Sequence, residues 1–404
     1  MKESLLYLCH RIPYPPNKGD KIASFNILKF LSQHYDVYLG CYIDDPFDKQ
    51  YIDVVKTFCE ECTILNLSPT WCKIKSIRAF ATGEAQSVPY YSNRNMSRWV
   101  TETLRKHSIS KAFVFSSSMA QFVEDHNELS KRVIHFVDID SDKWLQYSVR
   151  TKGVMSAIYR REYRTLARYE KQIASTFDVS CFVTPAETTM FQQMVDTQTA
   201  AKVFPLENGI DCEFFSNDIT HRLAEPYDLD SQNYVVFTGA MDYWANVDAV
   251  QWFLDNVWPT VISSVPDAHF YIVGSSPTKQ VQQFSQRTGI TVTGRVEDVR
   301  PYLSHSKAAV APMQIARGVQ NKILEAMSME CPVVTTDLGI EGIDNYPTPE
   351  VTVTASAEVM AKWVIDKLSN EHQPACRSRQ WLLDHYSWNA KLSPLLKFLD
   401  KSHV

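Results

Sequence analysis

Charged side chains of the types that bind diphosphate and ribose gather in one short segment of the sequence. Arg317 and Gly318 form a predicted turn, and an amphipathic helix is predicted to begin at about Val319. Lys322 lies near the start of this helix and Glu325 follows one turn later. The N–H groups and dipole at a helix start attract phosphate, and the two cations add positive charge for a diphosphate. The Glu325 carboxylate could accept hydrogen bonds from ribose hydroxyls, but spacing alone leaves open a surface helix with a Lys–Glu pair.

Two aspartates offer a second kind of chemistry in the first half of the chain. Asp138 and Asp140 follow the predicted strand Val133–Phe136. Their carboxylates could accept the proton of a hydroxyl group or orient that group. Solvated loop carboxylates explain the same pattern about equally well. His135, inside the strand pattern, is interpreted as a core histidine.

Motifs of several other enzyme classes do not occur in the sequence. No GxGxxG follows a predicted strand, and neither GxxxxGK[ST] nor GxSxG is present, which argues against dinucleotide, P-loop and serine-hydrolase sites. The formal net charge of −5 gives no basic field for a nucleic-acid partner. Cys59 and Cys62, with Cys72 nearby, have no fourth ligand at the usual spacing, so no metal is expected.

Cysteine usage and hydropathy predict a cytoplasmic protein. The nine cysteines are scattered, unlike those of an exported disulfide framework. The apolar run Leu5–Cys9 is too short for a signal-peptide core and is interpreted as a buried strand. No run of roughly 18 apolar residues predicts a membrane-spanning helix.

Short apolar runs alternate with helical patterns, as in parallel sheets joined by crossover helices. In the first half, strands are predicted at Ser4–Cys9, Asp36–Tyr42, Thr63–Leu67, Ala112–Phe115, Val133–Phe136, Val179–Val183 and Lys202–Phe204, and helices most clearly at Gly19–Gln33, Asn93–His107 and Ser156–Thr176. After a polar stretch, strands are predicted at Tyr234–Thr238, His269–Val273, Thr291–Thr293, Ala308–Ala311 and Val333–Thr335, with helices near Asn246–Trp258, Lys279–Arg287, Val299–Ser304 and Val319–Met329. Two such sets predict two facing Rossmann-like domains, with ligands beyond the carboxyl ends of their strands.

The segment Pro312–Met327 resembles the donor-binding signature of glycosyltransferase family 4, whose members have the GT-B fold. Other segments carry the same resemblance: Glu207–Asp211, Phe237–Gly239, Tyr271–Gly274, Thr293–Val296 and His385–Trp388. It covers nearly the whole chain and is stronger from about residue 205 onward. More narrowly, Val137–Trp144, Gly239–Tyr243 and Asn246–Val250 are similar to the sugar transferases associated with PEP-CTERM/exosortase exopolysaccharide systems.

The resemblance implies an α/β protein with a GT-B architecture of two facing Rossmann-like domains with parallel sheets. Residues 1–205 would be the acceptor domain, 206–385 the nucleotide-sugar donor domain, and 386–404 a helix that returns to the N-terminal domain. The implied activity moves a sugar from a nucleotide diphosphate sugar to a glycan or lipid-linked acceptor, with retention of configuration, in exopolysaccharide biosynthesis. Neither a metal nor another cofactor is expected.

The resemblance also implies roles for individual residues. The predicted donor-binding residues are Gly19, Gly239, Arg295, Val296, Arg317, Gly318, Val319, Lys322 and Glu325. The predicted catalytic residues are Asp138, Asp140, Arg317 and Lys322. The loop Pro15–Asp20, which contains Gly19, would lie beside the donor phosphates and the acceptor, although an ordinary strand-to-helix loop remains the alternative.

The sequence departs from the family pattern in places that matter for the donor. Arg317 replaces the first of two glutamates in the signature, of which Glu325 is the second. Met241 and Asn246 stand near positions where the family often has Arg and Lys. We therefore hypothesise that Arg317 and Lys322 replace those cations as the diphosphate clamp. Glu330 stands where a glycine usually ends the helix, so backbone strain is expected there.

The stretch Arg150–Lys171 contains seven basic and two acidic residues with tyrosines between them. It could rest on anionic lipid at the inner face of the plasma membrane, although a solvated helix face is the alternative. Two other functions also remain open. One is a sugar-nucleotide epimerase of the same fold, and the other is a non-catalytic nucleotide-sugar-binding partner in polysaccharide assembly.

Overall fold

The computed structural model describes residues 2–217, 229, 232–316, 318–371 and 374–400. The chain forms two compact units, one of Met1–Asn208 with Lys391–Val404 and the other of Gly209–Ala390. The sequence predicted domain boundaries after residues 205 and 385. In the structure the boundaries between the two units follow Asn208 and Ala390, a few residues later in both cases.

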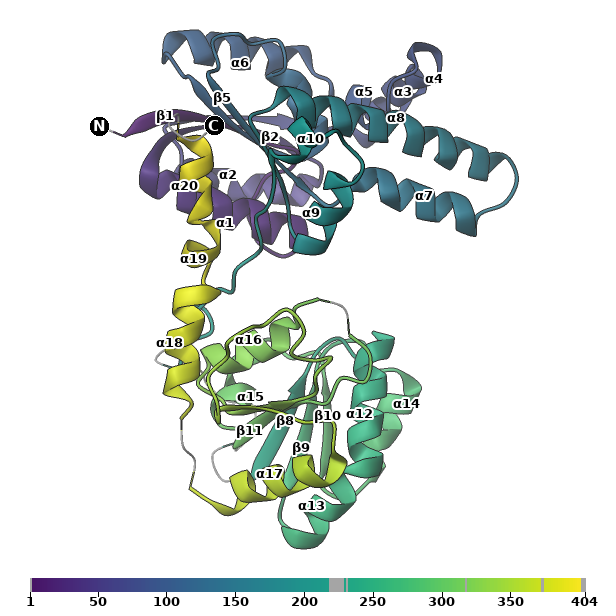
Figure 1. Cartoon of the computed structure of the whole chain (residues 1–404), viewed down its shortest axis with the longest axis vertical. Coiled ribbons are helices and arrows are strands. Elements are labelled where there is room, and N and C mark those ends of the chain that lie inside the picture. The colour runs from purple at the N-terminus through teal and green to yellow at the C-terminus, as the bar shows by residue number, and fades with distance from the viewer. Residues whose placement is uncertain (1, 218–228, 230–231, 317, 372–373, 401–404) are drawn as a thin grey trace. The chain divides into compact units, whose positions relative to one another are not determined.

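The N-terminal unit is built on a seven-stranded sheet with the order β3-β2-β1-β4-β5-β6-β7, in which all neighbouring strands are parallel (Figure 1). Its strands are β1 (Glu3–Cys9), β2 (Tyr35–Ile43), β3 (Glu61–Asn66), β4 (Lys111–Phe115), β5 (Lys131–Val137), β6 (Val179–Phe182) and β7 (Val203–Pro205). Its helices are α1 (Gly19–His34), α2 (Ile52–Lys56), α3 (Pro69–Ile77), α4 (Ala79–Thr82), α5 (Ser87–Tyr91), α6 (Arg94–Lys106), α7 (Asp140–Arg150), α8 (Val154–Thr176), α9 (Pro185–Gln192) and α10 (Thr197–Ala200), with 3₁₀ turns η1 (Pro46–Tyr51) and η2 (Ser117–Phe122). The strand order reverses between β1 and β4, which is the switch point where such sheets bind ligands.

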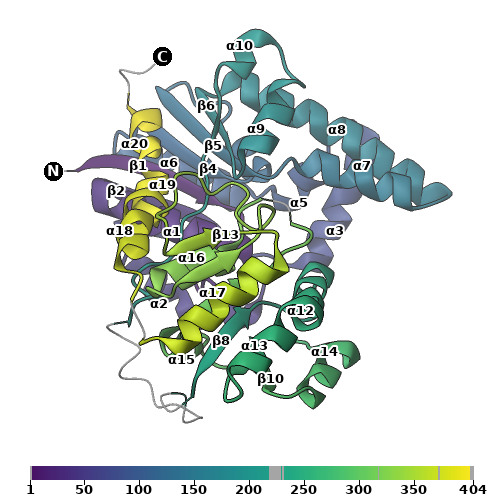
Figure 2. The same ribbon diagram turned by 60° about the horizontal axis from the view of Figure 1, so that its bottom comes forward.

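The C-terminal unit has a six-stranded parallel sheet with the order β10-β9-β8-β11-β12-β13. Its strands are β8 (Tyr234–Thr238), β9 (His269–Val273), β10 (Ile290–Gly294), β11 (Ala308–Ala311), β12 (Val333–Thr335) and β13 (Val351–Val353). Its helices are α12 (Trp244–Asn256), α13 (Trp258–Ser264), α14 (Lys279–Gln283), α15 (Arg300–Ser304), α16 (Asn321–Ser328), α17 (Ala357–Ser369) and α18 (Cys376–His385), with the 3₁₀ turn η3 (Phe284–Gln286) (Figure 2). Helix α19 (Trp388–Leu392) spans the changeover to the N-terminal unit.

Both faces of the C-terminal sheet are covered, which explains why its strands read as continuous apolar runs. Val235, Phe237 and Ile272 point to one face and join the buried cluster that includes α12, α13 and α17. Tyr234 and Val236 alternate with them and join the cluster that includes α15, α16 and α18. The alternation follows from the two-residue period of a strand, and it fixes α16 against one face of the sheet.

The predicted α/β class is confirmed, and each predicted strand is present to within two residues at either end. Helix α16 begins at Asn321 rather than at Val319. The prediction missed β13, α17 and α18 in the second half. Glu330 has a φ of +56°, which confirms the backbone strain expected where a glycine usually ends the helix.

The segment after α19 packs within the N-terminal unit. Helix α20 (Pro394–Leu399) lies against β5 and buries Leu395 and Leu399 completely. The Phe398 ring packs on Phe204 of β7 with centroids 5.1 Å apart. The sequence predicted a final helix returning to this domain, and the structure agrees.

A buried ion pair fixes α1 beside η1 in the N-terminal unit. The Lys21 Nζ lies 2.5 Å from Asp48 Oδ2, and the two side chains are only 2% and 5% exposed.

Replacing Lys21 alone by methionine should destabilise this unit by about 3 kcal/mol, because the Asp48 charge stays buried without its partner. The double variant Lys21→Met/Asp48→Leu should regain most of that loss in urea unfolding followed by circular dichroism. The exposed pair Lys56–Asp53 is the control, and Lys56→Met should cause no measurable change. Equal losses in the single and double Lys21 variants would contradict this account.

Candidate functional site

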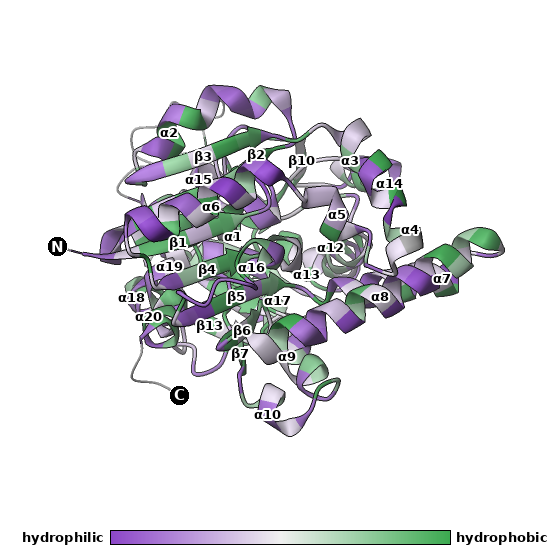
Figure 3. Ribbon diagram, turned by 90° about the horizontal axis from the view of Figure 1, so that it is seen from above, coloured by the Kyte–Doolittle hydropathy of each residue, from purple (hydrophilic) through white to green (hydrophobic). Residues whose placement is uncertain are grey.

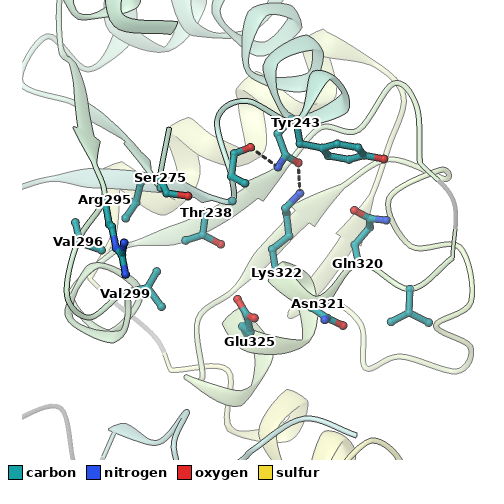
Figure 4. A pocket seen from close by; sticks show the side chains of 16 residues that line it. Thr238, Tyr243, Ser275, Arg295, Val296, Val299, Gln320, Asn321, Lys322 and Glu325 are labelled. Atoms are coloured by element: carbon teal, nitrogen blue, oxygen red, sulfur yellow. Dashed lines mark hydrogen bonds between the residues drawn. The ribbon is translucent and has the colours of Figure 1, made fainter. Parts of the chain in front are cut away.

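A hollow of about 540 Å³ opens on the C-terminal unit beyond the carboxyl ends of β8 and β9 (Figure 4). The loops after β8, β9 and β10, the first turn of α12 and the start of α16 form its wall. Its lining residues are Thr238, Gly239, Ala240, Tyr243, Asn246, Val273, Gly274, Ser275, Arg295, Val296, Val299, Val319, Gln320, Asn321, Lys322 and Glu325. Open parallel sheets bind their ligands at this position.

Two strand-end glycines make room for the hollow. Gly239 and Gly274 have φ angles of +153° and +157°, and the Gly239 N–H donates to the Val273 carbonyl at 3.0 Å. A Cβ on Gly274 would lie 1.7 Å from the Gly239 carbonyl oxygen, and a Cβ on Gly239 would lie 2.7 Å from Asn246 Nδ2. The two loops can approach this closely only because neither position carries a side chain.

Lys322 points into the hollow from the first turn of α16 (Figure 4). Its Nζ donates to Asn246 Oδ1 at 2.6 Å and lies 4.8 Å from the centroid of the Phe237 ring. Asn246 is held in turn, because its Nδ2 donates to the Ala240 carbonyl at 2.9 Å. Burial lowers the pKa of Lys322 to about 8, and Glu325 acts in the opposite direction. Within the described part of the chain no carboxylate forms an ion pair with this ammonium, so it faces the hollow as a positioned cation.

Glu325 lies one turn after Lys322 and lines the same hollow. Burial raises the pKa of its carboxyl group to about 7, while the positive charge of Lys322 opposes that rise. The site therefore holds one cation and one carboxyl group that both change charge close to neutral pH. Such a pair can bind an anion and accept hydrogen bonds from hydroxyl groups.

Arg295 brings a second positive charge to the wall of the hollow. It follows Gly294, whose φ is +69°, and its side chain is exposed. Val296 follows it and packs against the core cluster beside α15 and α16. Val319 also lines the hollow, whereas Gly318 is exposed with a φ of +67°.

The structure thus brings six of the predicted donor-binding residues to one hollow: Gly239, Arg295, Val296, Val319, Lys322 and Glu325. Gly318 lies next to it in the chain. Arg317, the other cation of the hypothesised clamp, lies outside the described residues. The role of Asn246 as the partner of Lys322 was missed, because the two residues are 76 positions apart in sequence.

Asp138 and Asp140 lie in the N-terminal unit, where β5 leads into α7. Both carboxylates pair with Lys143, whose Nζ is 2.7 Å from Asp138 Oδ2 and 3.1 Å from Asp140 Oδ1. Burial by itself would lower the pKa of Lys143, but the two aspartates outweigh that effect and raise it. Their predicted catalytic role stays a prediction.

His135 is the core histidine that the sequence predicted. Its Nδ1 accepts from the Val137 N–H at 2.9 Å, which leaves the proton on Nε2 to donate to the Leu206 carbonyl at 3.1 Å. Burial lowers its pKa to about 4. The ring is therefore neutral and has a structural role.

Gly19 is the first residue of α1, as predicted, and has open space where a side chain would stand. Beside it lies an ionic network that the sequence analysis missed. Asp20 Oδ2 lies 2.8 Å from Arg11 Nη1 and 3.4 Å from His10 Nε2, and Arg11 Nε lies 2.8 Å from Asp44 Oδ2. Burial would lower the pKa of His10, but its bond to Asp20 raises it to about 9. The signal was visible in principle, because charged residues directly follow the first predicted strand and open the first helix.

Comparisons with known proteins agree with this fold. Residues 232–370 match the model of the family described as "Glycosyl transferases group 1", so the C-terminal unit contains a group 1 glycosyl transferase domain. The solved structures of Alr3699/HepE from Anabaena, in complex with UDP, and of sucrose-phosphate synthase from Thermosynechococcus elongatus have the same fold. Their sequence identities are 13% and 14% and their TM-scores 0.57 and 0.59. The alignments cover 99% of both chains for the first protein and 98% of both chains for the second. The predicted GT-B class of two parallel-sheet α/β units is confirmed.

A curated relative is described as an uncharacterized 44.6 kDa protein in the cps region of Klebsiella pneumoniae. It is 22% identical over 184 residues, which are 43% of this chain and 47% of that protein. The alignment therefore spans about half the length of the relative.

The strand-end glycines generate a prediction with a matched control in the same unit. Gly274→Ala should destabilise the C-terminal unit by more than about 3 kcal/mol, because its Cβ meets the Gly239 backbone. Gly294→Ala also needs a positive φ but has nothing within 4 Å of the new Cβ, so it should cost only about 1 kcal/mol. Thermal and urea unfolding of both variants measure the difference, and equal losses of stability would contradict the close approach of the Gly239 and Gly274 loops.

Proposed function

We propose that this protein is a glycosyltransferase that moves a sugar from a nucleotide diphosphate sugar to a hydroxyl group of a glycan or lipid-linked acceptor. The observation that carries the proposal is Lys322, held by Asn246 at the start of α16 and pointing into the hollow. The segment matched by the group 1 family model contains this hollow. The Anabaena protein of the same fold was solved with UDP and with UDP-glucose, which supports a nucleotide-sugar ligand here.

In the proposed reaction the bond between the anomeric carbon and the diphosphate oxygen breaks, and a bond from that carbon to the acceptor oxygen forms. Lys322 and Arg295, with Arg317, stabilise the negative charge of the departing diphosphate. Electrostatic stabilisation of this kind is a major source of rate enhancement. Glu325 accepts hydrogen bonds from the ribose hydroxyls. We assign the acceptor proton to Asp138 or Asp140, and the cationic side chains take the place that a metal has in other transferases.

The finer parts of the proposal follow the sequence resemblance. They are membership of glycosyltransferase family 4, similarity to the PEP-CTERM/exosortase-associated sugar transferases, retention of configuration, and a role in exopolysaccharide biosynthesis. The description of the Klebsiella pneumoniae relative as a protein of the cps region supports that last point. We further propose that the protein works in the cytoplasm at the inner face of the plasma membrane, where Arg150–Lys171 meets anionic lipid.

A panel of UDP, GDP, ADP and dTDP sugars tests the function. Thermal shift identifies the nucleotide that binds, and incubation with membranes or glycan acceptors then follows the labelled sugar. Transfer of the label to acceptor is the expected result. Interconversion of donor sugars without an acceptor would assign an epimerase instead, and binding without turnover would assign a non-catalytic partner. Binding of none of these nucleotides would overturn the proposed site.

Replacing Lys322 by methionine should raise the donor KM about 10- to 100-fold, since a charge-assisted hydrogen bond to the diphosphate is lost. The fold should survive, because methionine suits the environment formed by Met313 and Phe237. The exposed Lys279 of the same unit supplies the control variant Lys279→Met, which should leave the KM unchanged. Initial-rate kinetics measure the donor KM, and circular dichroism checks the fold. An unchanged donor KM in Lys322→Met would contradict the proposed role of Lys322 in binding the diphosphate.

Donor affinity should depend on pH through Lys322. Its pKa of about 8 means that the free protein loses this positive charge as the pH rises through 8, and a diphosphate binds the charged form. Affinity at pH 9 should therefore be about tenfold lower than at pH 7.5, as expected for loss of one proton. Lys322→Arg keeps its charge over this range, so its affinity should stay nearly flat. Calorimetric titration with the donor nucleotide measures both proteins, and parallel pH profiles would show that another group is responsible.

A further inference from the structure

Large apolar side chains are exposed in two neighbouring places on the N-terminal unit. The end of α7 and the start of α8 expose Tyr147, Val149, Val154 and Met155, of which Val149 and Val154 are 76% and 77% accessible. Figures 1 and 3 show these two helices as a hairpin that projects from the sheet, with a hydrophobic end. An apolar tip of this kind costs free energy in water unless something covers it.

The second exposed set lies on α3 and α4. Trp71, Ile74, Ile77 and Phe80 recur every three residues and are 49% to 65% accessible. Residues three apart are neighbours on a helix surface, so each of these side chains lies beside the next one along α3 and α4. Such a row on a short helix suits insertion into a membrane interface better than it suits water.

A groove rich in arginine runs along α8, the helix that begins at the apolar tip. It has a volume of about 610 Å³ and is lined by one side of α8, including Arg160, Arg161, Arg164 and Arg168. The side chains of Arg160, Arg164 and Arg168 are exposed. Within the described residues none of these three has a hydrogen-bond or ion-pair partner among protein groups, so their charges are available to an anionic ligand.

The acidic residues of α8 lie on its buried side. Glu162 accepts from the Gln86 N–H at 2.7 Å, and Glu170 accepts from the Ser141 N–H at 3.1 Å. Both carboxylates are almost inaccessible. The outer side of α8 is therefore basic, with no acidic residue of the same helix to compensate its charge.

Arg161 lines the groove and also contacts Phe80 of the apolar row. Its guanidinium lies 4.7 Å from the centroid of the Phe80 ring and donates to the carbonyl oxygens of Ala79 and Glu84. Phe80 therefore borders the groove directly. Because the same helix runs from the apolar tip at Val154 to Arg168, basic and apolar groups follow one another along a single surface.

We infer that the hairpin α7–α8 and the segment α3–α4 form a docking surface for a bilayer of anionic phospholipid. The arginine side chains contact lipid phosphates, and the apolar tip and row enter the interfacial region. The described helices contain none with the length and apolar content to cross a bilayer, and insertion at the interface needs none. The inference rests on the proposed placement at the inner membrane face and gives that placement specific residues, while it does not depend on the transfer chemistry.

Flotation of the full chain with lipid vesicles tests the surface. Anionic vesicles of phosphatidylcholine with roughly 30% phosphatidylglycerol are compared with neutral vesicles of phosphatidylcholine alone. The protein should bind the anionic vesicles and bind the neutral ones much less. Arg160→Gln/Arg164→Gln/Arg168→Gln should weaken the partition coefficient about 100-fold, because each basic residue near an anionic surface contributes roughly fivefold.

Matched variants separate this surface from a general charge effect. Arg94→Gln/Arg98→Gln/Arg105→Gln removes the same charge from exposed positions on α6 and should leave vesicle binding within about twofold of the parent protein, as expected for charges outside the contact. Val149→Ser/Val154→Ser should reduce binding to anionic vesicles even at low salt. The thermal shift with the donor nucleotide, measured on every variant, reports the C-terminal site separately from vesicle binding.

Equal binding to neutral and anionic vesicles, or equal losses in the α6 and α8 triple variants, would overturn the inference. Light scattering gives the remaining outcome. If the protein ignores vesicles but forms a dimer that Val149→Ser/Val154→Ser dissociates, the surface belongs to a second copy of the chain and not to lipid.

Discussion

The placement of one partly buried ammonium group governs the design of the C-terminal unit. Lys322 has to give up part of its hydration to reach the hollow, and burial lowers its pKa for that reason. Asn246 compensates with a neutral oxygen rather than a carboxylate. A carboxylate in contact would neutralise the charge permanently, whereas an amide orients the lysine and leaves its charge for a ligand. The surrounding strands, loops and helices hold Lys322 and Asn246 in this position.

Two strand-end glycines and two helices hold Lys322 and Asn246 in contact. Asn246 must reach back over the loop after β8, and it can do so only where Gly239 has no side chain. Gly274 lets that loop lie against its neighbour after β9. The buried faces of α12 and α16, packed on opposite sides of the same sheet, then bring Asn246 and Lys322 together at its edge. A local contact of 2.6 Å thus depends on the packing of the whole unit.

The fold could be read from the sequence more fully than the site. Strands such as Tyr234–Thr238 are continuous apolar runs bounded by turn residues, and that signal is strong in parallel sheets. The strand Val351–Val353 has only three residues, of which one is buried, and so gave no comparable signal.

The site could be predicted only in part. Lys322 and Glu325 were recognised because both lie in one local motif. Their pairing with Asn246 and the network of His10, Arg11, Asp20 and Asp44 depend on contacts between distant segments, which spacing in the sequence does not reveal. Arg317 belongs to the same predicted motif but lies outside the described residues.

The packing of α20 has a consequence for how the protein acquires its structure during synthesis. The sheet of the N-terminal unit is complete in sequence once β7 has been made, yet Leu395 and Leu399 are part of the buried interior of that unit. The entire C-terminal unit must leave the ribosome before these side chains become available. Until then the surface of the first unit that α20 covers stays open to water, so this unit cannot complete its core before Pro394–Leu399 has been synthesised.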